Sequence, residues 1–139
     1  MFRTILVPLD GSEFGEQALP AAVALARKAN AELRLVHVVP PRHAPDARSE
    51  AAKYLKAHAG RLTVDGGVRV GTDVLGGSID ECLCEYARRT DCDLIVLTSH
   101  GRGALARVWL GSVTDKLVRT APCPVLTVRT PDESHPRVA

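Results

Sequence analysis

The sequence predicts a doubly wound α/β domain, in which a five-stranded parallel sheet carries helices on both of its faces. Short apolar runs alternate with amphipathic helical patterns along the chain, and this alternation favours a mainly parallel sheet. Two of the runs, residues 4–9 and 93–98, are almost continuously apolar, which is typical of strands buried on both faces. The length of 139 residues suits one domain, residues 1–139.

The first expected strand, TILVPL at residues 4–9, leads into a helix over residues 10–31. Within residues 10–31, apolar residues recur at i, i+3, i+4 and i+7, which is the period of an amphipathic helix. Ser12 is expected to cap the N-terminus of this helix. Pro20 lies inside the pattern, so we expect a missing backbone hydrogen bond and a kink there.

The middle of the chain repeats this alternation. Residues 32–39, ELRLVHVV, form the second expected strand, and the proline-rich segment 40–48 cannot extend it. A helix is expected over residues 49–62 and a third strand over residues 68–75. His37 lies within the second strand, and we interpret it as a hydrogen-bonded histidine of the sheet rather than as a ligand.

The last part of the chain supplies two helices and two strands. Residues 78–81, SIDE, form a capping box that begins a helix. A strand over 93–98, a helix over 112–120 and a strand over 124–129 follow, and the polar tail 130–139 is expected to be disordered. The inner face of the last helix is expected to carry Val113, Leu117 and Val118.

Two loops follow strands at the sheet edge where ligands of such folds bind, beyond the carboxyl ends of the strands and where the strand order reverses. If the strands 4–9 and 93–98 are neighbours, these loops face one crevice. Asp10 ends the first strand, and its carboxylate would accept hydrogen bonds from ribose hydroxyls or an adenine amino group. Equally, Asp10 would cap the next helix or form a turn with Gly11, and the sequence leaves both readings open.

The second loop has features of a phosphate-binding segment. Its glycines permit close approach of a ligand to the backbone, and Gly111 and Ser112 open a helix whose free N–H groups favour an anion. The alternative is structural, because residues 112–115, SVTD, also fit a capping box in which Ser112 caps its own helix.

Several other classes of protein are excluded. The chain has no G-x-x-x-x-G-K-[ST] loop, no G-x-G-x-x-G after the first strand and no G-x-S-x-G elbow. A net charge of +2, with only two Phe, two Tyr and one Trp, argues against nucleic-acid binding. No apolar run is long enough to span a membrane, so we expect a cytoplasmic protein. Its four cysteines are expected to be free thiols.

Three segments resemble the universal stress protein family: ILVPLDGSEFGEQALPAAVALA, LRLVHVV and DLIVLTSHGRGALARVWLGSVTDKLVRTAPCPVLTVR. The resemblance runs from about residue 3 to residue 129 and includes the order of the elements. It implies a Rossmann-like sheet with strand order 3-2-1-4-5, which would make the first and fourth strands neighbours. It also implies a homodimer, for which the edge strand 124–129 is the expected interface.

One branch of this family binds ATP through the pattern G-x2-G-x9-G-[ST]. Gly101, Gly111 and Ser112 match this pattern, but Thr98 stands where the first glycine is expected. Its β-branched side chain would either crowd the nucleotide or hydrogen-bond to it. The resemblance also assigns the following residues to the nucleotide site: Pro8, Leu9, Asp10, Val38, Leu97, Ser99 and Val113. Because the loop contains no lysine, we expect Arg102 and Arg107 to neutralise phosphate charge.

The resemblance therefore implies an ATP-binding stress-response regulator that takes up ATP, alone or with Mg²⁺. We expect it to act through nucleotide-dependent conformation rather than turnover, because no convincing base or water-positioning group for fast hydrolysis is present. The alternative is a dimeric interaction module of the same family that does not bind ATP, and Thr98 is the feature that favours it. Neither reading needs a nucleic acid or a membrane as a partner.

Overall fold

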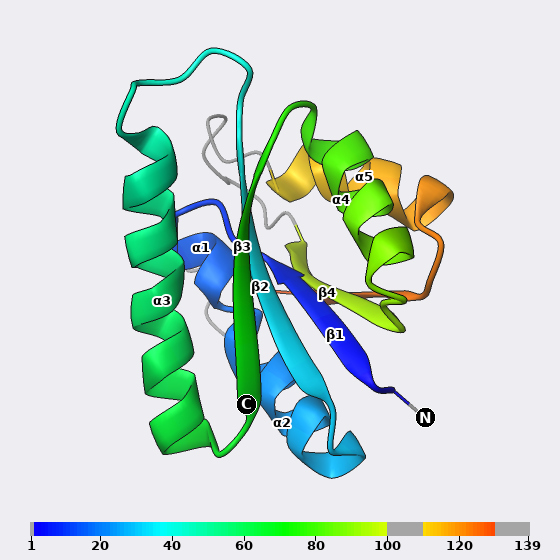
Figure 1. The fold of residues 1–139 in the computed structure, drawn as a ribbon. Coiled ribbons are helices and arrows are strands. Elements are labelled where there is room, and N and C mark those ends of the chain that lie inside the picture. Colours follow the sequence, from blue (N-terminus) through cyan, green and yellow to red (C-terminus); the bar gives the residue numbers. More distant parts are fainter. Residues whose placement is uncertain (1, 100–109, 130–139) are drawn as a thin grey trace, which may run out of the picture.

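The computed structural model describes residues 2–99 and 110–129, and these form a parallel sheet between two layers of helices (Figure 1). The strand order is β3-β2-β1-β4-β5 and every pair is parallel, which confirms the expected fold. The strands are β1 (Thr4–Pro8), β2 (Glu32–Val39), β3 (Arg69–Gly76), β4 (Leu94–Ser99) and β5 (Val125–Arg129). The helices are α1 (Glu13–Glu16), α2 (Leu19–Ala29), α3 (Ala47–Gly66), α4 (Ile79–Arg89) and α5 (Leu110–Thr120).

Each face of the sheet has its own apolar core, as alternation along buried strands requires. Helices α1, α2 and α3 lie on one face and α4 and α5 lie on the other (Figure 1). In β1, Ile5 and Val7 belong to the core under α2 and α3, whereas Leu6 belongs to the core under α4 and α5. Helices therefore cover both faces of the sheet, so the ends of the strands are the places where a ligand can reach it.

The helix predicted over residues 10–31 is two helices, so the expectation of a kink at Pro20 is wrong. Gln17 and Ala18 separate α1 from α2, and Pro20 lies in the first turn of α2. The first turn of a helix has no intrahelical partner for its N–H groups, so a proline costs nothing there. Ser12 caps α1 as predicted, because its hydroxyl oxygen accepts a hydrogen bond from the Gly15 N–H at 3.1 Å.

The later helices agree with the expectations only in part. Ser78 is the N-cap residue of α4 as expected, but the capping-box bond is not made, since its hydroxyl donates to Asp80 Oδ1 at 2.9 Å and makes no cap bond to the backbone. Helix α5 begins at Leu110, so Ser112 is its third residue and not its N-cap. Val118 is 62% exposed and does not belong to the inner face of α5. The tail 130–139 lies outside the described residues.

An arginine is held on the α4 face of the sheet by two side chains. Arg34 on β2 donates to the Tyr86 hydroxyl at 2.9 Å and to Asp73 Oδ2 at 2.7 Å, and Tyr86 donates to that same carboxylate oxygen at 2.6 Å. Burial, together with the bond to Asp73, raises the pKa of Tyr86 to about 12. A Cβ atom at Gly71 would overlap the Arg34 guanidinium, so the glycine makes room for this cluster.

Candidate functional site

The two loops singled out in the sequence leave the sheet side by side. Strands β1 and β4 are neighbours, with Ile5 opposite Leu94 and Leu6 opposite Ile95. The chain order of the strands reverses between them, since β2 and β3 lie beyond β1 and β5 lies beyond β4. This confirms the adjacency that the crevice requires, at the position where open parallel sheets bind their ligands.

Asp10 is part of a tight turn after β1. Its Oδ1 accepts hydrogen bonds from the Ser12 N–H at 3.0 Å and from the Ser12 hydroxyl, while Gly11 between them has a φ of 87°, which favours glycine. The expectation that Asp10 forms a turn with Gly11 is therefore confirmed, and the turn uses the Oδ1 atom of Asp10. Within residues 2–99 and 110–129, no protein group other than Ser12 hydrogen-bonds to this carboxylate, so Oδ2 is available to a ligand.

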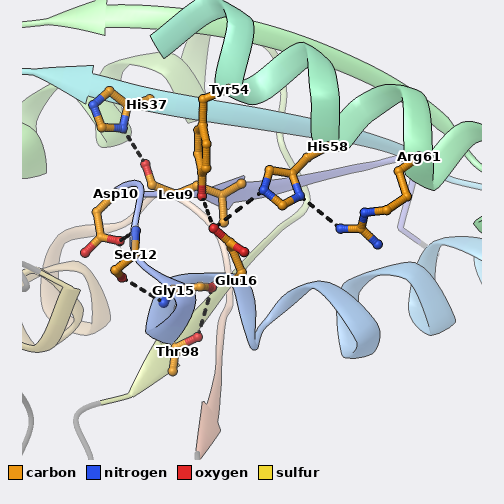
Figure 2. Close-up of polar contacts among 10 residues, drawn as sticks. All are labelled: Leu9, Asp10, Ser12, Gly15, Glu16, His37, Tyr54, His58, Arg61 and Thr98. Carbon is orange, nitrogen blue, oxygen red and sulfur yellow. Dashed lines mark hydrogen bonds and ion pairs between the residues drawn. The ribbon is translucent and has the colours of Figure 1, made fainter. Parts of the chain in front are cut away.

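His37 supports the same turn from β2. Its Nδ1 lies 2.8 Å from the carbonyl oxygen of Leu9, and a ring nitrogen must carry a proton to donate to a carbonyl. Figure 2 shows this contact directly beside Asp10. The interpretation of His37 as a hydrogen-bonded histidine of the sheet is confirmed, and the backbone that precedes Asp10 is held in place.

The backbone of Val38 faces the same edge of the sheet. The Leu9 N–H donates to the Val36 carbonyl oxygen at 2.8 Å, and alternate residues of a parallel strand direct their backbone groups toward the same neighbour. Val38 therefore directs its N–H and C=O toward the β1 side of β2, beyond Pro8, where β1 ends. Its side chain is only 2% exposed, so Val38 offers a ligand its backbone donor and acceptor.

Thr98 is fully buried, and its hydroxyl donates to the carbonyl oxygen of Gly15 in α1 at 3.2 Å (Figure 2). Its own carbonyl oxygen accepts from the Thr114 hydroxyl in α5 at 3.5 Å. The residue in the position of the expected glycine thus joins β4 to one helix on each face of the sheet. Its side-chain hydroxyl is used within the protein.

The remaining site candidates differ in how much of each the structure describes. The side chains of Pro8, Leu9, Leu97 and Val113 are buried, so these residues can meet a ligand at this edge chiefly through their backbone. Ser99 ends β4, and Gly111 and Ser112 lie in the first turn of α5, directly after the second loop. The loop candidates Gly101, Arg102 and Arg107 lie outside the described residues.

A polar cluster between α1 and α3 was not anticipated from the sequence. Tyr54 and His58 of α3 both contact Glu16 of α1, and Arg61 contacts His58 (Figure 2). The only sequence signal is the spacing of Tyr54 and His58, which places them on one side of a helix. Their partner in α1 depends on how the helices pack, which that spacing does not determine.

Three other expectations concern the described residues. No group of three or more acidic, histidine or cysteine side chains suitable for a metal ion occurs within residues 2–99 and 110–129. In the same ranges, no helix is long and apolar enough to cross a membrane. Cys82, Cys84, Cys92 and Cys123 are free, as expected.

Comparison with known proteins agrees with the architecture. The sequence profile of the universal stress protein family matches residues 1–129. A universal stress protein of Thermus aquaticus is 37% identical, with 93% of this chain and 100% of that protein covered.

Two solved structures are also similar. A universal stress protein from Lactobacillus plantarum has a TM-score of 0.77 at 27% identity, and the match covers 92% of this chain and 98% of that one. A universal stress protein in complex with cAMP has a TM-score of 0.74 at 26% identity, with 94% of this chain and 98% of that one covered.

Proposed function

Because this chain belongs to the universal stress protein family, we propose that it binds ATP or another adenine nucleotide and acts as a cytoplasmic stress-response regulator. The observation that carries this proposal is the pairing of β1 with β4. That pairing brings the Asp10 turn and Ser99, the last residue of β4, to one edge of the sheet, next to the backbone of Val38. A similar protein of this family has been solved with cAMP, which is a ligand of the same chemical class.

The backbone of Val38 has the hydrogen-bonding pattern that suits adenine. A carbonyl oxygen accepts from the exocyclic amino group of adenine, and a neighbouring N–H donates to a ring nitrogen. Guanine presents a carbonyl oxygen and a ring N–H in the corresponding positions, so its donors and acceptors are reversed. The proposed site therefore prefers adenine to guanine.

The sugar and phosphates would be bound on either side of this base contact. Oδ2 of Asp10 would accept hydrogen bonds from the ribose hydroxyls, since Oδ1 is already occupied by Ser12. The N-terminus of α5, with Gly111 and Ser112 in its first turn, would attract the phosphates. Gly101 would allow close approach of the loop, and Arg102 and Arg107 would neutralise charge.

The contacts of Thr98 favour nucleotide binding over the alternative of an interaction module that does not bind ATP. The alternative rested on a threonine that crowds the site. The Thr98 side chain is instead buried with its hydroxyl on the Gly15 carbonyl oxygen, so it does not project toward a ligand. We propose binding rather than turnover, with the bound nucleotide setting the conformation that a partner recognises.

The proposal is tested by calorimetric titration with ATP, AMP and GMP, alongside the emission of Trp109, the one tryptophan of the chain. ATP and AMP are expected to give saturable signals, and GMP is expected to bind at least tenfold more weakly. Gly111→Val is expected to abolish the ATP signal, because a β-branched side chain would obstruct the α5 N-terminus. Cys84→Ser changes a side chain whose Sγ contacts Thr120 at the C-terminal end of α5, the end opposite the proposed phosphate site. This variant is the matched control and should bind normally. No heat at millimolar ATP would instead support the interaction module.

We also propose a homodimer through β5, because the two edges of the sheet differ. At the β3 edge, Arg48 of α3 donates to the outward carbonyl oxygen of Val74 at 3.1 Å and occupies part of the exposed backbone. At the β5 edge, Leu126 is 39% exposed. An edge strand directs a row of backbone groups outward, and an exposed apolar side chain beside them favours pairing with a second chain.

A further inference from the structure

The side chain of His37 contacts the carbonyl oxygen at the point where the pairing of β1 with β2 ends. Pro8 lies opposite Val36, and the Leu9 N–H donates to the Val36 carbonyl oxygen at 2.8 Å. The next bond of a parallel ladder would run from the Val38 N–H to the Leu9 carbonyl oxygen. That oxygen instead accepts from His37 Nδ1 at 2.8 Å (Figure 2). A side chain therefore takes the place of the next backbone donor.

The Val38 N–H lies just beyond the last bond of this ladder. Within residues 2–99 and 110–129, no backbone hydrogen bond joins Val38 to Leu9, although Val38 is only 2% exposed. Buried backbone N–H groups are nearly always paired, because burial removes the water that would otherwise accept from them. A buried donor that the ladder does not use, at the end of a strand, is a group to which a ligand can bind.

The pairing of β2 with both of its neighbours explains why the histidine can act in this way. Since Pro8 and Val36 are partners, the residues that follow them, Leu9 and His37, lie at the same level of the sheet. On its other side His37 is opposite Val74 of β3, so its backbone is held by that strand. The ring can therefore donate across to Leu9 without giving up a bond of the sheet.

We propose that His37 is a positioning residue for base recognition: by occupying the Leu9 carbonyl oxygen, its Nδ1–H ends the ladder before Val38 and reserves the Val38 N–H for a ring nitrogen of adenine. This inference rests on the proposed function, which assigns the backbone of Val38 to the base. His37 itself touches no ligand in this scheme. Without the histidine donor, the Leu9 carbonyl oxygen accepts from the Val38 N–H, and the base loses that donor.

The first test is hydrogen exchange of the Val38 amide, measured by NMR on the protein without nucleotide. In His37→Phe, pairing with Leu9 should slow this exchange about fivefold relative to the wild type. His37→Asn is the matched control and should exchange as the wild type does, because its amide nitrogen lies as far along the side chain as Nδ1. His37→Gln carries its nitrogen one bond farther out and should resemble His37→Phe. Unchanged exchange in His37→Phe, or equal exchange in the Asn and Gln variants, would overturn the proposal.

The second test is calorimetric titration of the same proteins with AMP and GMP. His37→Phe should weaken AMP about fivefold and GMP less than about twofold, because guanine presents a ring N–H that cannot accept from Val38. His37→Asn should restore the preference for AMP. An equal loss for both nucleotides would indicate a merely structural role and overturn the proposal.

The two tests also separate this inference from the proposed function. If the wild-type protein binds neither AMP nor GMP, the proposed function fails, and the role of His37 in base recognition fails with it. If the wild-type protein prefers AMP and His37→Phe leaves that preference unchanged, only the role of His37 is lost.

Discussion

The hydroxyl of Thr98, at the end of β4, donates to the carbonyl oxygen of Gly15 in α1 at 3.2 Å, across 83 positions of sequence. Thr98 is fully buried, and Gly15 is also buried. The bond ties the strand that precedes the second loop to the short helix that follows the first loop. The two segments that make the proposed nucleotide site are thereby connected beneath it.

This contact predicts that Thr98→Val destabilises the protein by about 1 kcal/mol, because valine keeps the shape but loses the hydrogen bond. Thr98→Ser keeps the hydroxyl and is the control for the bond itself, although it also removes a buried methyl group. Urea denaturation followed by far-ultraviolet circular dichroism measures both. Equal stability of Thr98→Val and the wild type would show that the bond contributes nothing.

The Arg34 cluster predicts a strong coupling between Gly71 and Arg34. Gly71→Ala should cost about 1–2 kcal/mol, because its Cβ overlaps a guanidinium that Asp73 and Tyr86 hold in place. In an Arg34→Ala background, the same substitution should cost about 0.5 kcal/mol or less. Denaturant titration of the four proteins in this cycle measures the coupling. Additive effects would contradict the steric explanation.

The hydrogen bonds to the Asp93 carboxylate predict that the folded protein loses stability in acid. The backbone N–H groups of Arg3 and Thr4 donate to its carboxylate and hold the pKa of Asp93 below its ordinary value. Because the folded pKa is lowered, the stabilisation is present above the unfolded pKa of about 4 and is lost as the pH falls through the lower folded value. Asp93→Asn should cost about 1 kcal/mol or less at pH 7, since the site is partly exposed. Its stability should change less than that of the wild type below pH 4, as denaturation at a series of pH values will show.

The proposed dimer predicts different effects of proline at the two sheet edges. The Ile95 N–H donates to the Pro124 carbonyl oxygen, so the backbone of Pro124 faces β4. Successive residues of a strand direct their backbone groups to opposite sides, so Thr127 directs its N–H away from β4. Thr127→Pro removes that outward donor without removing a bond to β4, and it should convert the dimer to a monomer in sedimentation experiments.

The matched control lies on the other edge. Gly77 N–H donates to the Val39 carbonyl oxygen, so Thr72 of β3 also directs its N–H outward. Thr72→Pro should leave the dimer intact. A wild-type monomer at micromolar concentration, or dissociation by Thr72→Pro alone, would contradict an interface at β5.

Local sequence patterns predicted most of the elements because those patterns depend on neighbouring residues. Apolar runs such as residues 4–9 form strands wherever both faces are buried, and the N-cap at Ser12 needs only a hydroxyl close to the next turn. The same logic failed at Pro20, where the one expected helix is two helices. At Ser78 the helix begins as expected, but the serine hydroxyl binds Asp80 and not the backbone. The strand order was expected from the family resemblance, since periodicity does not specify which strands pair.

The sequence by itself therefore determined the alternating elements, the presence of a glycine-containing loop after the fourth strand and the carboxylate that ends the first. Tertiary structure decided what those groups contact. It placed the Thr98 hydroxyl on Gly15, gave one oxygen of Asp10 to Ser12, and brought Tyr54 of α3 to Glu16 of α1, 38 positions away. The physical reason is that periodicity reports which side of an element is buried. The partner of a buried polar group depends on how helices and strands distant in sequence pack together.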